Sequence, residues 1–375
     1  MVDVTTAPPG STGRGGDAGD DGSARAMGRE SGDVVQQRPP ARATLADVAR
    51  RAGVSKGTAS KALNGRGEIR PETRQRVLEA ADALSFTPSV LAQNLANGRT
   101  GTVGVLTNDL EGRFVIPILM GAEDALGAGR ISVILTDARG DAIREQQQLR
   151  TLLERQIDGL IVVGGPRTDP RPSLGQDLPV PVVYAYAPSE DPQDLSLAAD
   201  NVQAGRIAAE HLWDLGRRRI AYVGGDPTYA ASREREAGAA AALAEHGATL
   251  LGTGAGSGNW SERWGRAATT RLLAQHPDLD AVVAASDQLA RAALDILRDH
   301  GRRVPEDVAV VGHDNWSLVV TNTRPELTSV DTRLELLGRT AASRLFAALS
   351  GDELGAGVEL LPVELAVRGS TVADG

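Results

Sequence analysis

The sequence contains no cysteine, and its histidines are few. Without cysteine the chain has no disulfide, zinc finger, iron–sulfur cluster or thiol nucleophile. The five histidines are His211, His246, His276, His300 and His313. No two of them are three or four residues apart, which is the spacing that places two ligands on one helix face, so we expect no metal centre and no metal cofactor.

Aromatic residues are also scarce, at 3%, against 43 glycines and 19 prolines. A core with few aromatics is built from Ala, Val, Leu and Ile, which is typical of parallel sheets covered by helices. The hydrophobic fraction of 41% and the charged fraction of 24% are those of a globular protein. A length of 375 residues indicates two or three domains.

Long apolar runs are missing as well. No stretch approaches the length that spans a bilayer, and residues 1–43 lack the apolar segment of a signal peptide. These absences predict a cytoplasmic protein with no membrane partner.

Charge and composition divide the chain into three parts. Residues 1–43 are rich in Gly, Pro, Ala and Ser and predict a disordered tail, although an over-extended start, with Met27 as the true first residue, stays open. Residues 44–98 contain eight basic and five acidic residues, whereas residues 99–375 contain 27 basic and 38 acidic residues. The only two lysines, Lys56 and Lys61, both lie in the small basic part.

The basic part begins with a helix-turn-helix pattern, TLADVARRAGVSKGTASKALN. Apolar spacing predicts a first helix over 45–52, capped by Thr44 together with Asp47. Gly53 supplies the turn, and Ser55 can cap a second helix that extends to about residue 63.

The second helix of such a motif enters the major groove of DNA. Its outward residues are expected to face base edges or phosphates: Lys56, Gly57 and Lys61 the bases, and Thr58 and Ser60 the phosphates. Ala59 and Ala62 should face inward. In a third helix Pro71 occupies the first position, and Val77, Leu78, Ala81 and Leu84 share one face. A small Ala-rich three-helix bundle without a DNA role is the alternative.

The segments TLADVARRAGVSKGTASKALNG, PETRQRVLEAADALSFTP and LAQNLANGRTGTVGV together resemble the head of the lactose repressor/galactose repressor (LacI/GalR) family of bacterial transcription factors. The resemblance implies that residues 89–98, too short for a stable isolated helix, form a hinge helix that folds on operator DNA. It assigns Leu95 as a wedge in the minor groove, against the alternative of a linker leucine lying on the body. Arg70 departs from the serine cap usual in the family.

The complete set of residues that we expect at DNA is Thr44, Ser55, Lys56, Gly57, Thr58, Ser60, Lys61, Asn64, Arg70, Ala92 and Leu95. The corresponding domains are a tail over 1–43, a helix-turn-helix domain over 44–88, a hinge helix over 89–98 and an effector-binding and dimerisation domain over 99–375.

In the acidic part short apolar runs alternate with helical patterns, as in TVGVL, IPILMGAEDAL, ISVIL and REQQQLRTLLERQ, and the same order repeats after residue 204. This alternation predicts βαβ units in two similar α/β lobes that face each other across a ligand cleft. The dinucleotide G-x-G-x-x-G motif, the P-loop and the G-x-S-x-G elbow are all missing, so the usual signs of an α/β enzyme are absent.

Further segments, among them VGVLTNDLEGRF, ADNVQAGRIAAEHL, SREREAGAAAAL and DVAVVGHDN, resemble the family's effector domain, which shares the type I fold of periplasmic sugar-binding proteins. The resemblance places seven residues at the cleft: Asp109, Phe114, Tyr186, Arg235, Trp260, Asp287 and Asn315. Carboxylates accept bonds from sugar hydroxyls, arginine donates a rigid fork, and tryptophan offers a flat apolar face.

Each of these assignments has a plainer alternative. Asp287 could only cap the helix that follows it, Arg235 could form a surface pair with Glu234 or Glu236, and Trp260 could be helix core. Tyr186 stands where relatives often have Asp, a departure that weakens inference of the effector by analogy.

The sequence therefore predicts a dimeric repressor of carbohydrate-utilisation genes, released from a palindromic operator by a small sugar. Co-repression stays open as the opposite sign of control. The C-terminal sequence lacks the leucine heptads of a tetramerisation helix. The rival functions are a solute receptor without a DNA role, which does not account for residues 44–98, and a sugar- or nucleoside-processing enzyme.

Overall fold

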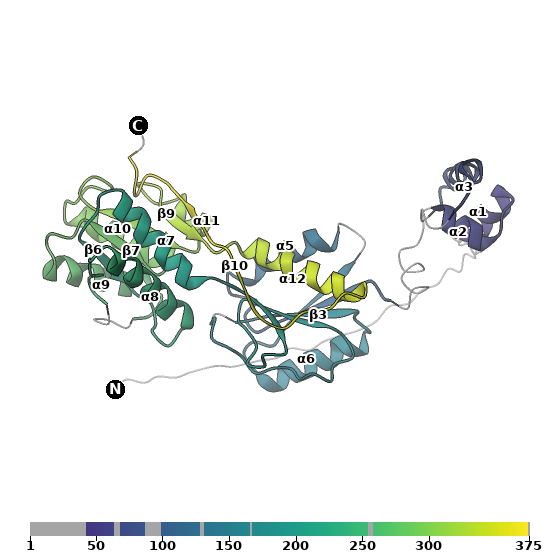
Figure 1. Cartoon of the computed structure of the whole chain (residues 1–375), viewed down its shortest axis with the longest axis horizontal. Helices are drawn as coiled ribbons and strands as arrows, with labels where there is room; N and C mark the ends of the chain where they lie inside the picture. Colours follow the sequence, from purple (N-terminus) through teal and green to yellow (C-terminus); the bar gives the residue numbers. More distant parts are fainter. Residues whose placement is uncertain are drawn as a thin grey trace, which may run out of the picture. The chain divides into compact units, whose positions relative to one another are not determined.

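The computed structural model describes residues 43–63, 68–86, 99–127, 131–165, 167–253 and 258–373, and the structural statements below concern these residues. The chain divides into two compact units, Met1–Thr87 and Pro88–Gly375 (Figure 1). All but the last residue of the tail expected over 1–43 lies outside the described residues, as do Asn64 and the expected hinge helix with Ala92 and Leu95.

The first unit, which we call the head, contains α1 (Leu45–Ala52), α2 (Lys56–Leu63) and α3 (Pro71–Ala83). The limits predicted for the first helix are confirmed. Its cap is reciprocal, since the Asp47 N–H donates to Thr44 Oγ1 at 3.4 Å and the Thr44 N–H donates to Asp47 Oδ2 at 3.0 Å. Gly53, at φ 66°, ends α1 in a left-handed conformation that favours glycine.

The core of the head is made of small side chains from all three helices: Val48, Ala49, Ala52, Ala59, Ala62, Val77, Ala80 and Ala81. The inward orientation predicted for Ala59 and Ala62 is confirmed. The prediction for Leu78 is wrong, because its side chain is 41% exposed and Ala80 is buried in its place. With Pro71 at the first helical position, Val77, Ala80 and Ala81 lie on the buried face.

The second unit, which we call the body, consists of two α/β lobes. The sheet of the first lobe is parallel and has the strand order β10-β5-β4-β3-β1-β2. Its strands are β1 (Thr102–Thr107), β2 (Ser132–Asp137), β3 (Gly159–Val163), β4 (Val182–Ala185), β5 (Leu195–Ala199) and β10 (Gly357–Leu361).

In the first lobe α5 (Val115–Leu126) and α12 (Leu334–Leu349) cover one face of the sheet, and α6 (Ala142–Glu154) covers the other (Figure 1). Gly121 of α5 lies against the Glu335 carbonyl, and Gly338 of α12 lies against the Ile118 carbonyl. A Cβ atom at either glycine would collide with that backbone. The two glycines therefore let α5 and α12 approach closely, which matters because both helices line the pocket described below.

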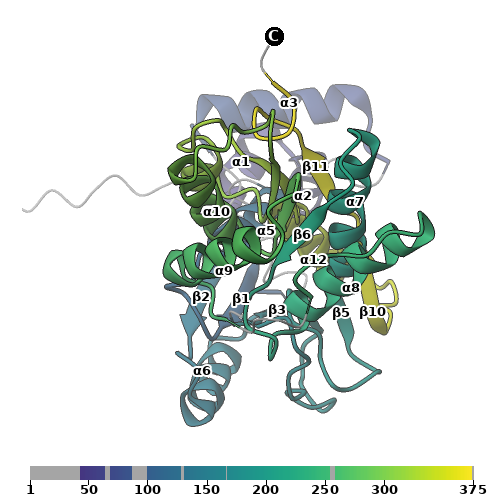
Figure 2. The same cartoon turned by 90° about the vertical axis from the view of Figure 1, so that its left-hand side faces the viewer.

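The sheet of the second lobe has the order β11-β9-β8-β7-β6, with β11 antiparallel to β9 and the other pairs parallel. Its strands are β6 (Ile220–Val223), β7 (Ala281–Ala284), β8 (Ala309–His313), β9 (Thr328–Asp331) and β11 (Glu364–Ala366). In Figure 2, α7 (Asn201–Asp214) and α8 (Ala230–Glu245) flank one side of this sheet, and α9 (Glu262–Gln275) and α10 (Asp287–Asp299) flank the other. The short α11 (Ser317–Val320) follows β8.

Three segments connect the lobes: β5 to α7, β9 to α12, and β10 to β11. The predicted α/β architecture with two lobes is confirmed, and the alternating pattern located the main strands and helices. The sequence pattern did not reveal β5, β10 and β11. In the part of the chain that the structure describes, no helix combines the length and the hydropathy that crossing a membrane requires.

Candidate functional site

The exposed face of α2 carries the residues predicted to face DNA bases. Lys56, Gly57 and Lys61 are exposed, while Ala59 and Ala62 hold the opposite face of the helix in the core. Gly57 has no side chain, so the surface of α2 is recessed at this position, between Lys56 and Lys61. The arrangement presents two cations on a short helix that is packed firmly from behind.

The hydroxyl groups of Thr44, Ser55 and Thr58 are engaged at the helix N-termini of the head. Ser55 Oγ accepts the Thr58 N–H at 3.1 Å and lies 2.9 Å from Thr58 Oγ1, so the predicted cap of the second helix is confirmed. Thr44 Oγ1 donates to Asp47 at 2.6 Å. Arg70 precedes α3, is exposed, and makes no side-chain cap bond, because a guanidinium donates hydrogen bonds and cannot accept them from the first N–H groups of the helix.

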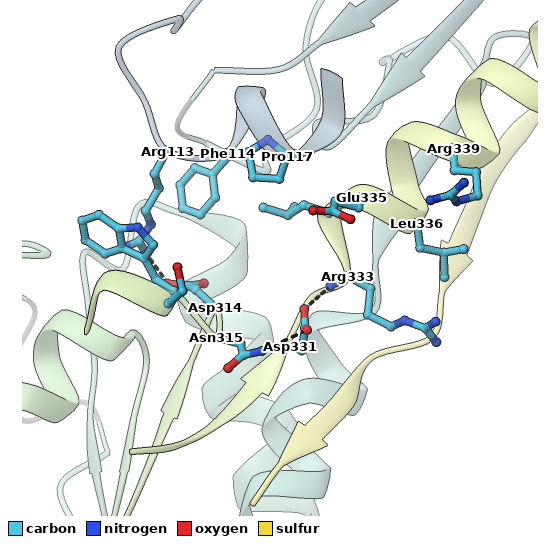
Figure 3. A pocket seen from close by; sticks show the side chains of 13 residues that line it. Arg113, Phe114, Pro117, Asp314, Asn315, Asp331, Arg333, Glu335, Leu336 and Arg339 are labelled. Carbon is cyan, nitrogen blue, oxygen red and sulfur yellow. Dashed lines mark hydrogen bonds and ion pairs between the residues drawn. The ribbon is translucent and has the colours of Figure 1, made fainter. Parts of the chain in front are cut away.

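A pocket of about 530 Å³ lies between the two lobes of the body (Figure 3). It is lined by the start of α5, by the segment after β8, and by the β9–α12 connection with the first turns of α12. The lining residues are Arg113, Phe114, Pro117, Asp314, Asn315, Trp316, Ser317, Asp331, Arg333, Leu334, Glu335, Leu336 and Arg339.

Asp314 is the buried charge at the centre of the pocket wall. Its carboxylate forms ion pairs with Arg113 of the first lobe and, at 3.1 Å, with Nη1 of Arg235 on α8 of the second lobe. The side chain of Asp314 is 4% exposed and that of Arg235 is 5% exposed. Two guanidinium groups from opposite lobes thus compensate one carboxylate, which a buried charge requires.

Arg235 has further partners that fix its position on the second lobe. Its Nε donates to Asn201 Oδ1 at 3.0 Å, and its Nη1 donates to the Ala285 carbonyl at 2.7 Å. Because Arg235 is buried, the alternative of a surface pair with a neighbouring glutamate is wrong. Arg235 does not line the pocket itself but orients Asp314, which does.

Aromatic rings surround Arg113. Its guanidinium lies 4.7 Å from the centroid of Phe114 and 4.8 Å from that of Trp316. Phe114 in turn stacks on Tyr186 with 5.0 Å between the ring centroids. Tyr186 is buried behind Phe114, and this burial raises the pKa of its hydroxyl, which therefore stays protonated at neutral pH.

Asn315 belongs to a polar network on the same wall. Its Nδ2 donates to Asp331 Oδ2 at 3.1 Å, and its Oδ1 accepts from Arg368 at 2.8 Å. Asp331 also accepts the Arg333 N–H at 2.7 Å. Figure 3 shows Asn315, from the segment after β8, beside Asp331 at the end of β9, and Asp331 beside Arg333 on the connection to α12.

Asp287 is completely buried and lies behind this wall instead of lining it. Its oxygens accept the Trp316 N–H at 2.7 Å and the Ser329 hydroxyl at 2.6 Å. Burial, followed by the nearby negative charge of Asp314, raises the pKa of the Asp287 carboxyl above its ordinary value. The carboxyl therefore positions the turn that carries Trp316, and the cap of α10 comes from Ser286, which accepts the Leu289 N–H at 3.4 Å.

The two remaining predicted residues lie away from the lining. Asp109 follows β1, and its backbone N–H donates a hydrogen bond to Thr107 Oγ1 at 3.2 Å. Trp260 packs against Gly225 and meets Tyr229 edge-on, with 5.6 Å between the centroids. Its buried indole N–H has no hydrogen-bond partner among the residues described here.

Of the seven predicted effector residues, Phe114 and Asn315 line the pocket, while Arg235, Tyr186 and Asp287 support residues that do. The other lining residues were not predicted from the sequence, among them Arg113, Asp314, Trp316, Asp331 and Glu335. Three of these stand directly beside predicted residues, since Arg113 precedes Phe114, and Asp314 and Trp316 flank Asn315. The signal available for Asp314 was its place at the end of a buried strand, the same signal that was applied to Asp109 and Asp287.

The pocket can bind a neutral, hydroxyl-rich molecule. Its carboxylate and amide oxygens accept hydrogen bonds, its guanidinium groups donate them, and its aromatic rings provide apolar faces. Across the ranges that the structure describes, no group of three or more His, Asp or Glu side chains is arranged to hold a metal ion.

Two family models match the chain. Residues 44–89 match the model described as bacterial regulatory proteins, lacI family, and residues 209–371 match a periplasmic binding protein-like domain. The first range covers the head, and the second covers most of the second lobe together with α12 and β10.

Curated relatives match over most of their length. The HTH-type transcriptional regulator CelR of Thermobifida fusca is 36% identical over 318 residues, which cover 83% of this chain and 93% of CelR. Catabolite control protein A of Priestia megaterium is 31% identical over 331 residues, which cover 88% of this chain and 99% of the relative.

Solved structures agree with these matches. A complex of CelR with cellobiose has a TM-score of 0.59 at 33% identity and covers 88% of this chain and 100% of the other. A lac repressor dimer bound to operator and the anti-inducer ONPF has a TM-score of 0.63 at 28% identity, with 88% and 99% covered.

Proposed function

The chain belongs to the lacI family of bacterial regulatory proteins, and from this premise we propose how its two units divide the work of a sugar-responsive DNA-binding transcriptional regulator. The head reads operator DNA through α2, and the interlobe pocket binds a carbohydrate effector. Effector binding releases the operator, so the protein acts as a repressor of carbohydrate-utilisation genes. The function is one of binding and involves no catalytic turnover.

The observation that carries this proposal is the interlobe pocket of about 530 Å³, which lies within the range of small-molecule sites. Both lobes contribute to it, so a ligand that contacts both walls favours one arrangement of the lobes over another. Only such differential binding can shift an equilibrium, and the coupling is reciprocal, so operator DNA weakens effector binding by the same factor.

We propose a gluco-disaccharide such as cellobiose as the effector class. CelR, which is similar over nearly its whole length, has been solved as a complex with cellobiose. A disaccharide presents two rings with apolar faces and many hydroxyl groups. Phe114 and Trp316 supply rings for such faces, and Asp314, Asn315 and Asp331 supply acceptors for the hydroxyls.

For DNA we propose a symmetric operator read by a homodimer, because two-fold protein symmetry matches two half-sites. Lys56 and Lys61 face base edges, and Thr44, Ser60 and Arg70 face phosphates. Residues 89–98, with Ala92 and Leu95, form the hinge that contacts the minor groove. A regulator of chromosomal operators works in the cytoplasm, where we place this protein.

Titration calorimetry with cellobiose, maltose and lactose tests the effector site. We expect Asn315→Ala to weaken the affinity for the bound sugar about tenfold, because it removes a polar group of the pocket wall. The matched control is Asn322→Ala, which removes an exposed amide of the same lobe outside the pocket. Failure of all the sugars to bind, or equal losses in both variants, would contradict the proposed site.

A further inference from the structure

Helix α8 begins without a cap from its own neighbourhood. The residue before its first turn is Tyr229, which is extended and whose side chain makes no capping hydrogen bond. The first N–H groups of a helix have no partner inside the helix, and a serine, threonine, asparagine or aspartate usually accepts from them. The sequence preceding α8 offers no such residue at the cap position.

The missing cap comes from the other lobe. Thr168 Oγ1 accepts the Ala231 N–H at 2.9 Å, and Asp169 Oδ2 accepts the Ala230 N–H at 3.2 Å. Both acceptors follow β3 of the first lobe and stand more than 60 positions before the helix that they cap. We call residues 167–169 the clasp.

Ion pairs and the aromatic ring of Tyr229 add to this contact between the clasp and α8. Arg167 donates from Nη2 to the Thr228 carbonyl at 2.6 Å, and its guanidinium lies 4.6 Å from the centroid of the Tyr229 ring. Asp169 pairs with Arg233 on the first turn of α8 at 3.2 Å. Burial opposes ionisation of Asp169, but the Ala230 N–H and the two arginines outweigh it and lower its pKa, so the carboxylate is charged at the positive end of the helix.

The clasp is tied firmly to the first lobe. Arg171, two residues further on, donates from Nη2 to both carboxylate oxygens of Glu145 on α6, at 2.8 Å each. Both side chains are nearly buried, at 12% and 14% exposure. Movement of the first lobe therefore carries the clasp with it.

Helix α8 also contacts the pocket wall from behind. Arg235, on its second turn, bonds Asp314, and Asp314 pairs with Arg113 of the first lobe. The first lobe thus contacts the system of α8 and Asp314 at two separate points, the N-terminus of the helix and the carboxylate on the pocket wall.

We propose that Thr168 and Asp169 are positioning residues that cap α8 across the cleft only while the lobes are closed, and that this detachable cap stabilises the closed arrangement. The interlobe contact itself rests on the hydrogen bonds above. Its effect on effector affinity rests on the proposed function. An opened cleft leaves two N–H groups of α8 to water, and a closed cleft restores their acceptors.

The absence of cysteine makes the lobe distance directly measurable. Ile143→Cys on α6 and Asp299→Cys on α10, both exposed, place one spin label on each lobe. Labelled full-length chains are mixed with an excess of unlabelled chains, so that double electron–electron resonance measures distances within one chain and not between chains. The test variant combines Thr168→Val with Asp169→Ala. A separate conservative variant, Thr168→Ser, keeps the hydroxyl that accepts the Ala231 N–H.

The matched control is Ser261→Ala. Ser261 caps α9 within the second lobe, accepting the Trp264 N–H at 3.2 Å, so its loss removes one cap without touching the cleft. Without effector we expect the test variant to populate longer interlobe distances, while the control and Thr168→Ser keep the original distribution. With cellobiose we expect an affinity about five- to thirtyfold weaker in the test variant, the range for the loss of one or two caps.

An unchanged distance distribution in the folded test variant overturns the inference, and so does an equal shift in the Ser261→Ala control. Circular dichroism establishes that each variant is folded before the distances are compared. If the unsubstituted chain binds no cellobiose, the proposed effector class is wrong, whereas the ligand-free distances still decide whether the clasp holds the lobes.

Discussion

The head and the body place their functional residues in opposite ways. In the head, Lys56 and Lys61 stand on one short helix, are exposed, and are separated by one and a half turns. In the body, Arg113 comes from a segment about 200 residues before those of Asp314 and Asp331, and the side chain of Asp314 is buried. A surface that meets a large, rigid partner is built locally, whereas a pocket that encloses a small ligand has to be assembled from distant strand ends.

The difference has an energetic consequence. An exposed lysine can be removed with little effect on folding, because its charge is solvated with or without DNA. A buried ion pair behaves differently, since removing one partner leaves the other charge unpaired in a poorly solvated place. Substitutions in the head should therefore separate binding from stability, and substitutions in the pocket wall should affect both.

The largest effect is expected from Asp314→Asn. The change leaves the buried Arg235 and the neighbouring Arg113 without their carboxylate. We expect the free energy of unfolding of the body to fall by about 3–5 kcal/mol, with loss of the effector response. Urea unfolding followed by tryptophan fluorescence measures this, because all four tryptophans lie in the body. Asp352→Asn, at an exposed acid, is the control, and equal losses in both variants would show that Asp314 is not a compensated buried charge.

The second prediction concerns pH and the buried His313. Burial, followed by the charge of Arg235, lowers the pKa of His313 to about 4. Below the ordinary value of about 6.5 the unfolded chain binds a proton that the folded chain refuses, so stability falls as the pH drops from 6.5 to 4. Over this range the free energy of unfolding falls by up to about 3 kcal/mol, since each unit of pKa difference is worth 1.36 kcal/mol.

His313→Gln should flatten this part of the pH profile, whereas His300→Gln, at an exposed site, should leave it unchanged. Thermal unfolding measured at half-unit steps of pH provides the comparison. A profile that is identical in the unsubstituted chain and in His313→Gln would mean that His313 takes up its proton in the folded state.

The smallest effect on folding, and a large one on function, is expected from Lys61→Ala. We predict operator affinity about tenfold weaker, since one side chain at a base edge is worth about 1–3 kcal/mol. Unfolding and sugar affinity should not change. Fluorescence anisotropy with operator and random duplexes, at stated salt, measures the discrimination. Arg76→Ala removes an exposed cation from α3 and should lower the affinity for both duplexes alike, so an identical pattern in Lys61→Ala would remove its base-reading role.

The same contrast accounts for what could be predicted from the sequence. In the head, local rules were sufficient: the Thr44–Asp47 cap, the turn at Gly53 and the inward Ala59 and Ala62 depend on residues a few positions apart. The error at Leu78 concerns which face of α3 is buried. Leucine suggested burial there, but the register of α3 turns Ala80 inward instead.

In the body the predicted strand ends were correct, but the role of each carboxylate was not readable from its position. Asp109, Asp287 and Asp314 all follow or approach the end of a strand. Asp287 turns inward to accept the Trp316 N–H, whereas Asp314 faces the pocket between two arginines. The deciding partners lie on other strands and on the other lobe, so their contact depends on the tertiary arrangement and leaves no local pattern.

The measurement that tests the central claim most directly is the selection of random duplex DNA by the purified full-length protein at near-physiological salt. The bound pool is sequenced with and without cellobiose, maltose and lactose. The account predicts recovery of a two-fold symmetric site that one of the sugars abolishes. Recovery of no symmetric site under any condition, or of a site that no sugar affects, would contradict the coupling of a DNA-reading head to a sugar-binding body.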